Sequence, residues 1–286
     1  MPNFSIRFLY LKLYYIFYWR IKKLKGVNLR YFFLNLFFKT PLLEHKECKI
    51  KFFVPNSLTY RRSQNLLTTS PQIIEWLNSF EKNSVFFDIG SNIGIYSLYA
   101  CFLKKNISIY SFEPSTNNLR VLTKNIFINS YQDSIKIIPL PLSNKKFQFN
   151  KMQDNIFEEG GALNAYGVDF NFEGKKILSS GGSTYYVPSF SLDFLISLGI
   201  LELPNYIKID VDGNEHLILE GSTFLNNNQK TREILLEIND NFIDQKDKVF
   251  HYMKSYNFTL KKKFSNDSPS KTFGNTFDYL FKKNEV

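Results

Sequence analysis

The sequence predicts an α/β fold whose centre is an open, mostly parallel β-sheet. The first sign is the segment 85–94, in which an apolar strand ends at a glycine-rich turn and a helical segment follows. The second is that strand-like and helical segments go on alternating as far as residue 255. The third is a pair of strand-like segments, 258–262 and 275–281, which predicts an antiparallel hairpin that completes the sheet.

Each expected element rests on a local pattern. Strands are predicted where short segments are apolar or alternate in polarity, and helices where longer segments are periodic and follow a cap, a proline or a glycine turn. The expected strands are 49–54, 85–89, 107–112, 135–140, 206–211 and 233–238, and the expected helices are 63–80, 93–103, 115–129, 191–198, 215–224 and 242–255. Residues 144–188 are irregular and glycine-containing, so we expect an insertion of short strands and loops that covers the functional site.

The glycine-rich turn favours a nucleotide-like cofactor of one particular kind. Its pattern is D-x-G-x-x-x-G from Asp88 to Gly94, without the third glycine of a dinucleotide fingerprint. Ile95 follows Gly94, so the lysine of a phosphate-binding P-loop is absent. An acid beside the turn suits an amine-bearing or cationic ligand, such as the amino-acid end of S-adenosylmethionine. Glu113 follows Gly94 by 19 residues, close to the spacing expected of an acid that holds ribose hydroxyls.

Several stretches together resemble the FkbM-type methyltransferases, a branch of the class I S-adenosylmethionine-dependent enzymes. They are V-F-F-D-I-G-S-N-I-G from Val85, S-F-E-P from Ser111 and I-K-I-D-V-D-G-N-E from Ile207, with weaker matches L-P-L-S-N from Leu140 and S-L-D-F-L from Ser191. They span roughly residues 80–239 in the order of the family. The resemblance implies a Rossmann-like methyltransferase sheet and methyl transfer to a hydroxyl oxygen, often of a sugar or another natural-product alcohol.

The resemblance and the spacing together give a set of expected cofactor contacts. Leu142 and Ser143 follow the third strand of the motif region, where class I methyltransferases usually contact the adenine. Neither is acidic, so adenine recognition is expected to fall to backbone atoms. The expected cofactor-binding residues are Asp88, Gly90, Ser91, Asn92, Gly94, Glu113, Pro114, Leu142, Ser143 and Asp210.

The chemistry is expected at the ends of the strands 206–211 and 233–238, where several acids gather. Removing a proton from a neutral sugar hydroxyl calls for a carboxylate or a metal ion nearby. In one mechanism Asp210 is the general base, and Glu215 or His216 orients the acceptor. In the other, Asp210, Glu237 and Asp240, with Asn239, bind Mg²⁺ through oxygen ligands. We favour the metal-free base. The expected catalytic residues are Asp210, Glu237 and His216, and the expected substrate contacts are Asp212, Glu215 and Asn239.

Three residues of this region leave alternatives open. Asp212 stands where the family more often has glutamate, which keeps the charge but shortens its reach. Asp212 and Glu215 could instead only cap the following helix, where negative charge is favourable. Lys208, inside the strand, either pairs with one of the acids or faces the polar side of the sheet.

The positive charge of the chain is concentrated in its first 62 residues. The net charge is +10, and residues 1–62 alone carry 13 Lys and Arg against 2 Asp and Glu. We therefore expect a basic, aromatic N-terminal extension over 1–62 and a nearly neutral methyltransferase domain over 63–286. The two cysteines, Cys48 and Cys101, indicate neither a disulfide framework nor a metal cluster, so a reducing, cytoplasmic setting is expected.

The N-terminal extension has three interpretations. Its aromatic segment 4–19 is interrupted by Arg7 and Lys12, which argues against a membrane-spanning helix, and it lacks the cleavage site of a signal peptide. It could lie in the headgroup layer of an anionic membrane, as a peripheral contact at the inner membrane face. Packing against the catalytic domain is slightly favoured over this, and nucleic-acid binding ranks third.

Other function classes are less well supported than a sugar or glycan O-methyltransferase. A nucleic-acid methyltransferase would be expected to show an N-P-P-Y-type site or a Pro-Cys nucleophile loop, yet no Pro-Pro pair occurs and no proline precedes either cysteine. A cofactor-binding module without activity would not need the acids at the strand ends. The expected partner is therefore a sugar or glycan hydroxyl rather than nucleic acid, and the sequence leaves the oligomeric state open.

Overall fold

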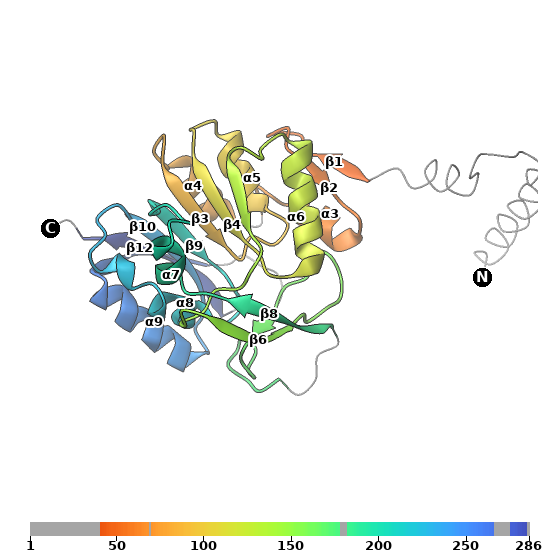
Figure 1. The fold of residues 1–286 in the computed structure, drawn as a ribbon. Helices are drawn as coiled ribbons and strands as arrows, with labels where there is room; N and C mark the ends of the chain where they lie inside the picture. Colours follow the sequence, from red (N-terminus) through yellow and green to blue (C-terminus); the bar gives the residue numbers. More distant parts are fainter. Residues whose placement is uncertain (1–40, 69, 178–181, 266–274, 285–286) are drawn as a thin grey trace, which may run out of the picture. The chain divides into compact units, whose positions relative to one another are not determined.

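The computed structural model describes residues 41–68, 70–177, 182–265 and 275–284, and its centre is a seven-stranded sheet with helices on both faces (Figure 1). The strands are β1 Leu42–Glu44, β2 Lys51–Phe53, β3 Val85–Ile89, β4 Ser108–Phe112, β5 Ile135–Ile138, β6 Gln148–Gln153, β7 Ala165–Tyr166, β8 Thr184–Ser189, β9 Tyr206–Ile209, β10 Glu233–Asn239, β11 Phe258–Ser265 and β12 Thr276–Lys283. The helices are α3 Ser57–Gln64, α4 Pro71–Asn78, α5 Ile95–Phe102, α6 Thr116–Ile128, α7 Leu192–Ser197, α8 Glu215–Glu220, the 3₁₀ turn η1 Thr223–Leu225 and α9 Ile243–Ser255.

The order of the strands places a ligand site at a defined edge of the sheet. The order is β11-β12-β10-β9-β3-β4-β5, with β10, β9, β3, β4 and β5 parallel. The hairpin of β11 and β12 pairs antiparallel with β10. The chain runs outward from β3 to β5 and then returns to the other side of β3 to form β9. The switch point therefore lies between β3 and β9, and ligands of open α/β sheets bind at the carboxyl ends of the strands there.

Alternation along the strands divides the interior into two cores. Phe87, Ile207 and Ile234 belong to the core under α7, α8 and α9. Phe86, which precedes Phe87, and Leu235, which follows Ile234, belong to the core under α4, α5 and α6. Because successive strand side chains point to opposite faces, a polar residue between two apolar ones is directed at a known side of the sheet. Charged residues at alternate positions of neighbouring strands can therefore meet on one face of the sheet.

The turn after β3 needs glycine for a steric reason. Gly90 has φ +81°, and a Cβ atom there would lie 1.8 Å from the carbonyl oxygen of Asp210. Gly94, with φ +86°, precedes α5, and its Cβ would lie 2.5 Å from the Cδ1 atom of Leu122 on α6. The first glycine thus lets the turn pass directly against the end of β9, and the second lets α5 approach α6.

The sheet and most helices confirm the sequence prediction, with two differences in the helices. The expected helix 63–80 is two helices, α3 and α4, and α3 begins earlier, at a capping box formed by Asn56 and Thr59. The expected helix 215–224 ends at Gly221 and continues only as the turn η1. A Cβ at Gly221 would lie 2.4 Å from the carbonyl oxygen of Ser143, so the chain passes too close to that loop for a longer side chain.

The first strands belong to the same compact unit as the large sheet. This unit runs from Leu42 to Val286 and so includes part of the range 1–62. The amides of Lys51 and Phe53 on β2 donate to the side chains of Asn129 and Asn125, at 2.9 and 2.7 Å. The expected helical segment 4–19 lies outside the described residues. Within the described part of the chain, no helix is both long and apolar enough to cross a membrane.

Residues 144–188 contain a second, three-stranded antiparallel sheet in the order β7-β6-β8. Met152 on β6 and Tyr166 on β7 are buried and line the same cavity as the glycine turn. Figure 1 shows β6 and β8 beside the carboxyl-end side of the large sheet. The small sheet therefore forms one wall of the site described next.

Candidate active site

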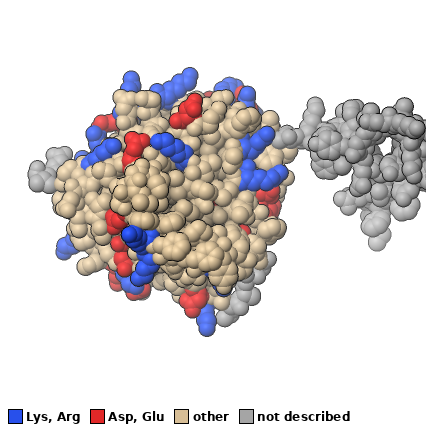
Figure 2. Space-filling view, viewed as in Figure 1, with Lys and Arg blue, Asp and Glu red and all other residues tan. Residues whose placement is uncertain are grey.

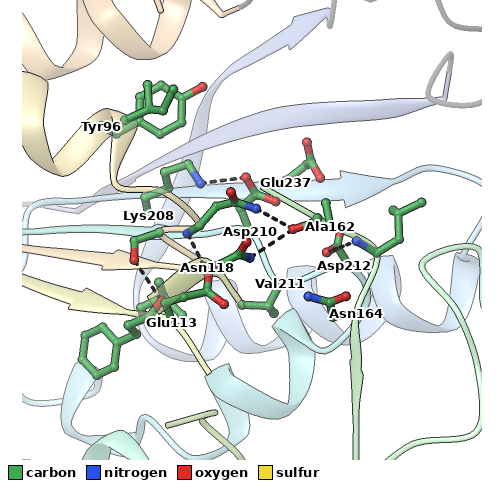
Figure 3. Close-up of a pocket in the computed structure, with 18 of the residues that line it drawn as sticks. Tyr96, Glu113, Asn118, Ala162, Asn164, Lys208, Asp210, Val211, Asp212 and Glu237 are labelled. Atoms are coloured by element: carbon green, nitrogen blue, oxygen red, sulfur yellow. Dashed lines mark hydrogen bonds and ion pairs between the residues drawn. The ribbon is translucent and has the colours of Figure 1, made fainter. Parts of the chain in front are cut away.

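A cavity of about 780 Å³ opens at the carboxyl ends of β3, β4 and β9. This volume falls in the range of 300–1,000 Å³ that is typical of small-molecule and cofactor sites. Many of the residues expected from the sequence meet here, and Figure 3 shows part of this lining. The expected residues that line the cavity are Gly90, Ser91, Asn92, Glu113, Pro114, Leu142, Asp210, Asp212 and Glu237.

Glu113 is held by backbone amides in a position that suits a ribose. Its Oε2 accepts a hydrogen bond from the amide of Asn92, and its Oε1 accepts one from the amide of Ser115, both at 2.8 Å. Burial raises the pKa of Glu113 to about 7, against the opposing effect of these two hydrogen bonds. Each carboxylate oxygen has a second lone pair, so the side chain can also accept hydrogen bonds from two vicinal hydroxyls.

Charged side chains form a row across four neighbouring strands, on the face toward α4 and α5. The register pairs Asp88 of β3 with Lys208 of β9, and Glu237 of β10 with Asp278 of β12. Lys208 is only 2 % exposed, and its Nζ lies 2.7 Å from the Oδ2 of Asp210. Figure 3 shows Lys208, Asp210 and Glu237 directed at one another. One buried cation is therefore shared by a group of acids.

Lys208 separates the acids into two kinds. Burial alone would raise the pKa of Asp210, but the ammonium of Lys208 outweighs burial and holds that pKa below its usual range. Burial also disfavours the charge of Lys208 itself, yet Asp210 and Asp88 raise its pKa above the ordinary value. Burial and the charge of Asp210 raise the pKa of Asp212 to about 7 and that of Glu237 well above its usual range. Asp210 is thus held in its ionised form, while Glu237 takes up a proton more readily than an ordinary glutamate.

The acids could also be read as a metal site, with a different membership from the expected one. Asp210, Asp212 and Glu237 each offer a carboxylate oxygen within 4.8 Å of the others. Oxygen ligands of this kind suit Mg²⁺. However, Asp210 already accepts from Lys208, and Asp212 accepts from the amide of Leu163 at 2.6 Å. The protein therefore supplies partners of its own to two of the three carboxylates, and the arrangement does not require an ion.

Three expected cofactor contacts do not line the cavity. Asp88 is completely buried, and its Oδ2 accepts from the amide and the hydroxyl of Ser97 at 3.1 and 2.5 Å. Gly94 is covered by Leu122, as described above. Ser143 shares a hydrogen bond of 3.1 Å with the hydroxyl of Ser189. These residues fix the frame of the site, and Asp88 lies beside Lys208 in the sheet, where burial raises the pKa of its carboxyl.

Glu215 and His216 also lie behind the cavity wall. Glu215 accepts hydrogen bonds from the amides of Val211 and Gly213 and from the side chain of Gln245. It therefore holds the loop after β9 in place, while burial raises its pKa to about 7. His216 is 5 % exposed, and burial lowers its pKa, so it is neutral. Neither residue is placed to touch an acceptor in the cavity.

The acids and amides after β10 are likewise occupied elsewhere. Asn239 donates to the carbonyl of Phe172 and accepts from the amide of Asn241. Asp240 accepts from Lys263 at 2.6 Å and from Lys246 at 2.9 Å. Asp240 thus pairs with lysines of β11 and α9, and the group of nearby carboxylates in the described residues contains Asp212 in place of Asp240 beside Asp210 and Glu237.

Other lining residues could not be identified from the sequence. Ala162, Leu163 and Asn164 come from the loop between β6 and β7, and Arg61 and Arg62 come from α3. Each of these segments is far from the motifs in sequence and reaches the cavity only through the tertiary fold. Asp278 and Tyr96 complete the wall beside Lys208. The one local signal in the sequence was Lys208 itself: a charged lysine within an apolar strand requires a buried acidic partner, which predicts further polar residues around it.

The strand order, the glycine turn at the switch point and the acid after β4 together define a Rossmann-like fold of the class I methyltransferases. The profile of the family described as "Methyltransferase FkbM domain" matches residues 88–260. The chain belongs to this family, which confirms the resemblance drawn from its motifs. Enzymes of this family use S-adenosylmethionine as the methyl donor.

Known proteins similar to the chain include one curated relative. The hexuronic acid methyltransferase AglP of Haloferax volcanii is 29% identical over 171 residues, which cover 60% of this chain and 62% of AglP. The chain thus matches less than two thirds of the length of that relative.

Among solved structures, a putative rRNA-methylase from Clostridium thermocellum has a TM-score of 0.45 and 9% identity, over 76% of this chain and 96% of its own. A putative tRNA (m1A22) methyltransferase of Streptococcus pneumoniae, Sp1610, in complex with S-adenosyl-L-methionine has a TM-score of 0.43 and 11% identity, over 77% and 75% of the two chains.

Replacing Lys208 by methionine should destabilise the fold strongly. Lys208→Met leaves Asp210 among other acids without its cation, and breaking a buried pair costs about 3 kcal/mol or more. The loss, measured by urea unfolding, should be larger at pH 7 than at pH 4, because Lys208 stabilises the ionised form of Asp210. Lys263→Met is the control: this lysine is 37% exposed and pairs with Asp240, so its loss should cost less than about 1 kcal/mol. Equal, small losses for both variants would contradict this account.

Proposed function

We propose that this chain transfers a methyl group from S-adenosylmethionine to a hydroxyl oxygen of a sugar or glycan precursor. The observation that carries the proposal is that one cavity holds both the glycine turn with Glu113 and the carboxylates at the ends of β9 and β10. The name of the relative AglP, a hexuronic acid methyltransferase, favours a sugar acceptor. The free thiols of Cys48 and Cys101 fit a reducing, cytoplasmic setting.

The residues of the cavity fit the cofactor. Glu113 would hold the ribose hydroxyls, and the apolar side chains of Pro114, Leu142 and Val211 would cover the adenine. The turn at Gly90 and Ser91 would lie against the methionine part. When bound, S-adenosylmethionine supplies a methyl group on a positively charged sulfur.

Asp212 is the stronger candidate for the general base. Asp210 was favoured from the sequence, but its contact with Lys208 lowers its pKa and so weakens it as a base. Asp212 also lines the cavity, and its pKa of about 7 is close to the working pH that a general base needs. We propose that Asp212 takes the proton of the acceptor hydroxyl, while the pair of Asp210 and Lys208 orients the acceptor.

A nucleic-acid acceptor is less well supported. Residues 41–286 carry 28 Lys and Arg against 26 Asp and Glu. On the face shown in Figure 2, basic and acidic side chains of the described residues are interspersed, and the basic ones do not form a continuous surface. Binding of nucleic acid rests mainly on such a surface.

The base assignment predicts a particular pH dependence. With saturating cofactor and a sugar acceptor, the methyl transfer rate should rise about tenfold per pH unit below pH 7 and level off above it, because only ionised Asp212 accepts the proton. Asp212→Asn should lower the rate at least 100-fold. A chelator such as EDTA should leave the rate unchanged.

Two results of the same assay would contradict this assignment. A rate that is independent of pH between 6 and 8 would point to Asp210 as the base, since its pKa lies below its usual range. Loss of activity with EDTA and its recovery with Mg²⁺ would show that the carboxylates bind a metal ion.

We also propose a peripheral contact with anionic membranes through residues 1–40. This segment contains eight Lys and Arg, no Asp or Glu, and many aromatic residues. Such composition suits the headgroup layer of an anionic bilayer. In sedimentation with vesicles, the full chain should bind phosphatidylserine-containing but not purely zwitterionic vesicles. The combined substitutions Lys22→Glu, Lys23→Glu and Lys25→Glu should release it, whereas unchanged binding would exclude this contact.

A further inference from the structure

We infer that Arg61 and Arg62 form a carboxylate-binding subsite in the wall of the cavity. The inference rests on the proposed function, because it assigns a ligand group to the same cavity. A carboxylate could come from two sources, the methionyl end of the cofactor or an acidic group on the sugar acceptor. The chemistry that the two arginines recognise is the same in both cases.

The two arginines differ from the other described arginines in what they contact. Arg120 pairs with Glu159 at 2.7 Å, and Arg232 pairs with Glu81. Both of these lie away from the cavity. Arg61 and Arg62 line the cavity, and neither forms an ion pair with a carboxylate among the residues that the structure describes. Two consecutive arginines of the chain thus line the cavity, and neither is paired with an acid of the described residues.

Arg62 is held in place by its own backbone contact. Its Nε donates to the carbonyl of Gly160 at 2.8 Å, which leaves the two Nη groups for another ligand. The side chain of Asn56, just before α3, donates to the carbonyl of Glu159 at 2.9 Å. These two bonds tie α3 to the loop that also carries cavity residues. A fixed guanidinium loses little freedom when it binds, so the Arg62 part of the subsite is organised in advance.

The position of Arg62 also relates the proposed subsite to the acids at the end of β9. Its guanidinium lowers the pKa of both Asp210 and Asp212, so it lies within electrostatic reach of these acids. A carboxylate bound by the arginines would therefore sit near the reacting hydroxyl.

The test combines two pairs of matched ligands. Calorimetry compares S-adenosylhomocysteine with 5′-methylthioadenosine, which keeps the nucleoside and thioether but lacks the amino-acid end. Methyl transfer assays with saturating cofactor compare a glucuronic acid glycoside with the corresponding neutral glucoside. The variants are Arg61→Gln, Arg62→Gln and Arg62→Lys, with Arg232→Gln as the matched control outside the cavity. Arg61→Gln is essential, because no hydrogen bond of the described fold depends on that side chain.

The two sources give different expected results. If the cofactor supplies the carboxylate, the Gln variants should bind S-adenosylhomocysteine at least tenfold more weakly, with unchanged binding of 5′-methylthioadenosine. If the acceptor supplies it, they should raise KM for the glucuronide at least tenfold and leave the glucoside unaffected. In either case Arg62→Lys should restore only part of the loss, because a lysine lacks the planar fork.

The control Arg232→Gln should change neither the binding of S-adenosylhomocysteine relative to 5′-methylthioadenosine nor the KM for the glucuronide relative to the glucoside. The inference is overturned if Arg61→Gln and Arg62→Gln also leave both ratios unchanged. This outcome differs from a failure of the proposed function, which would appear as wild-type protein that binds neither nucleoside. Thermal unfolding of each variant identifies any general loss of the fold, which would weaken both ligands of a pair equally and so also count against a carboxylate subsite.

Discussion

The site depends on the ion pair between the buried Lys208 and Asp210, whose carboxylate borders the cavity. Parallel pairing of β9 with β3 and β10 brings Asp88, Asp210 and Glu237 to the same end and the same face of the sheet. So many carboxylates cannot be buried together as anions, because each would raise the free energy of the others. The ammonium of Lys208 keeps Asp210 ionised, whereas burial raises the pKa of Glu237 well above its usual range and that of Asp212 to about 7. Acids with different protonation states can then serve different roles in one cavity.

The remaining parts of the fold position ligands against this pair. Gly90 allows the turn after β3 to touch the end of β9, so the cofactor region and the acids become neighbours. The amides of Asn92 and Ser115 fix Glu113 on the other side of the turn. The small sheet of β6, β7 and β8 brings the amide of Leu163 to Asp212. The parallel strands and the less regular segments therefore line one cavity together.

The sequence predicts what depends on local spacing and misses what depends on tertiary contacts. The mostly parallel sheet with its C-terminal hairpin, the glycine turn and Glu113 follow from patterns that are local in the chain or keep a fixed distance along it. Asp240 looked equivalent to Glu237 because both stand near the end of the same strand, yet Asp240 lies in the turn after β10 and pairs with Lys263 of β11. Arg61 and its neighbour on α3 carry no motif at all, and only the folding of α3 against the loop before β7 brings them to the cavity. The partner of Lys208 also could not be chosen from sequence, since register decides it.

The most direct test is calorimetric titration of the full chain with S-adenosylhomocysteine, comparing wild type with Glu113→Gln at pH 6 and pH 8. The account predicts micromolar binding by wild type that strengthens between these pH values, because Glu113, with a pKa of about 7, accepts from hydroxyls best when ionised. Glu113→Gln should bind at least tenfold more weakly and without this pH dependence, whereas Glu75→Gln on the exposed side of α4 should match wild type. Folded wild type that binds no S-adenosylhomocysteine, or equal binding by the Glu113 variant, would contradict the assignment of this cavity.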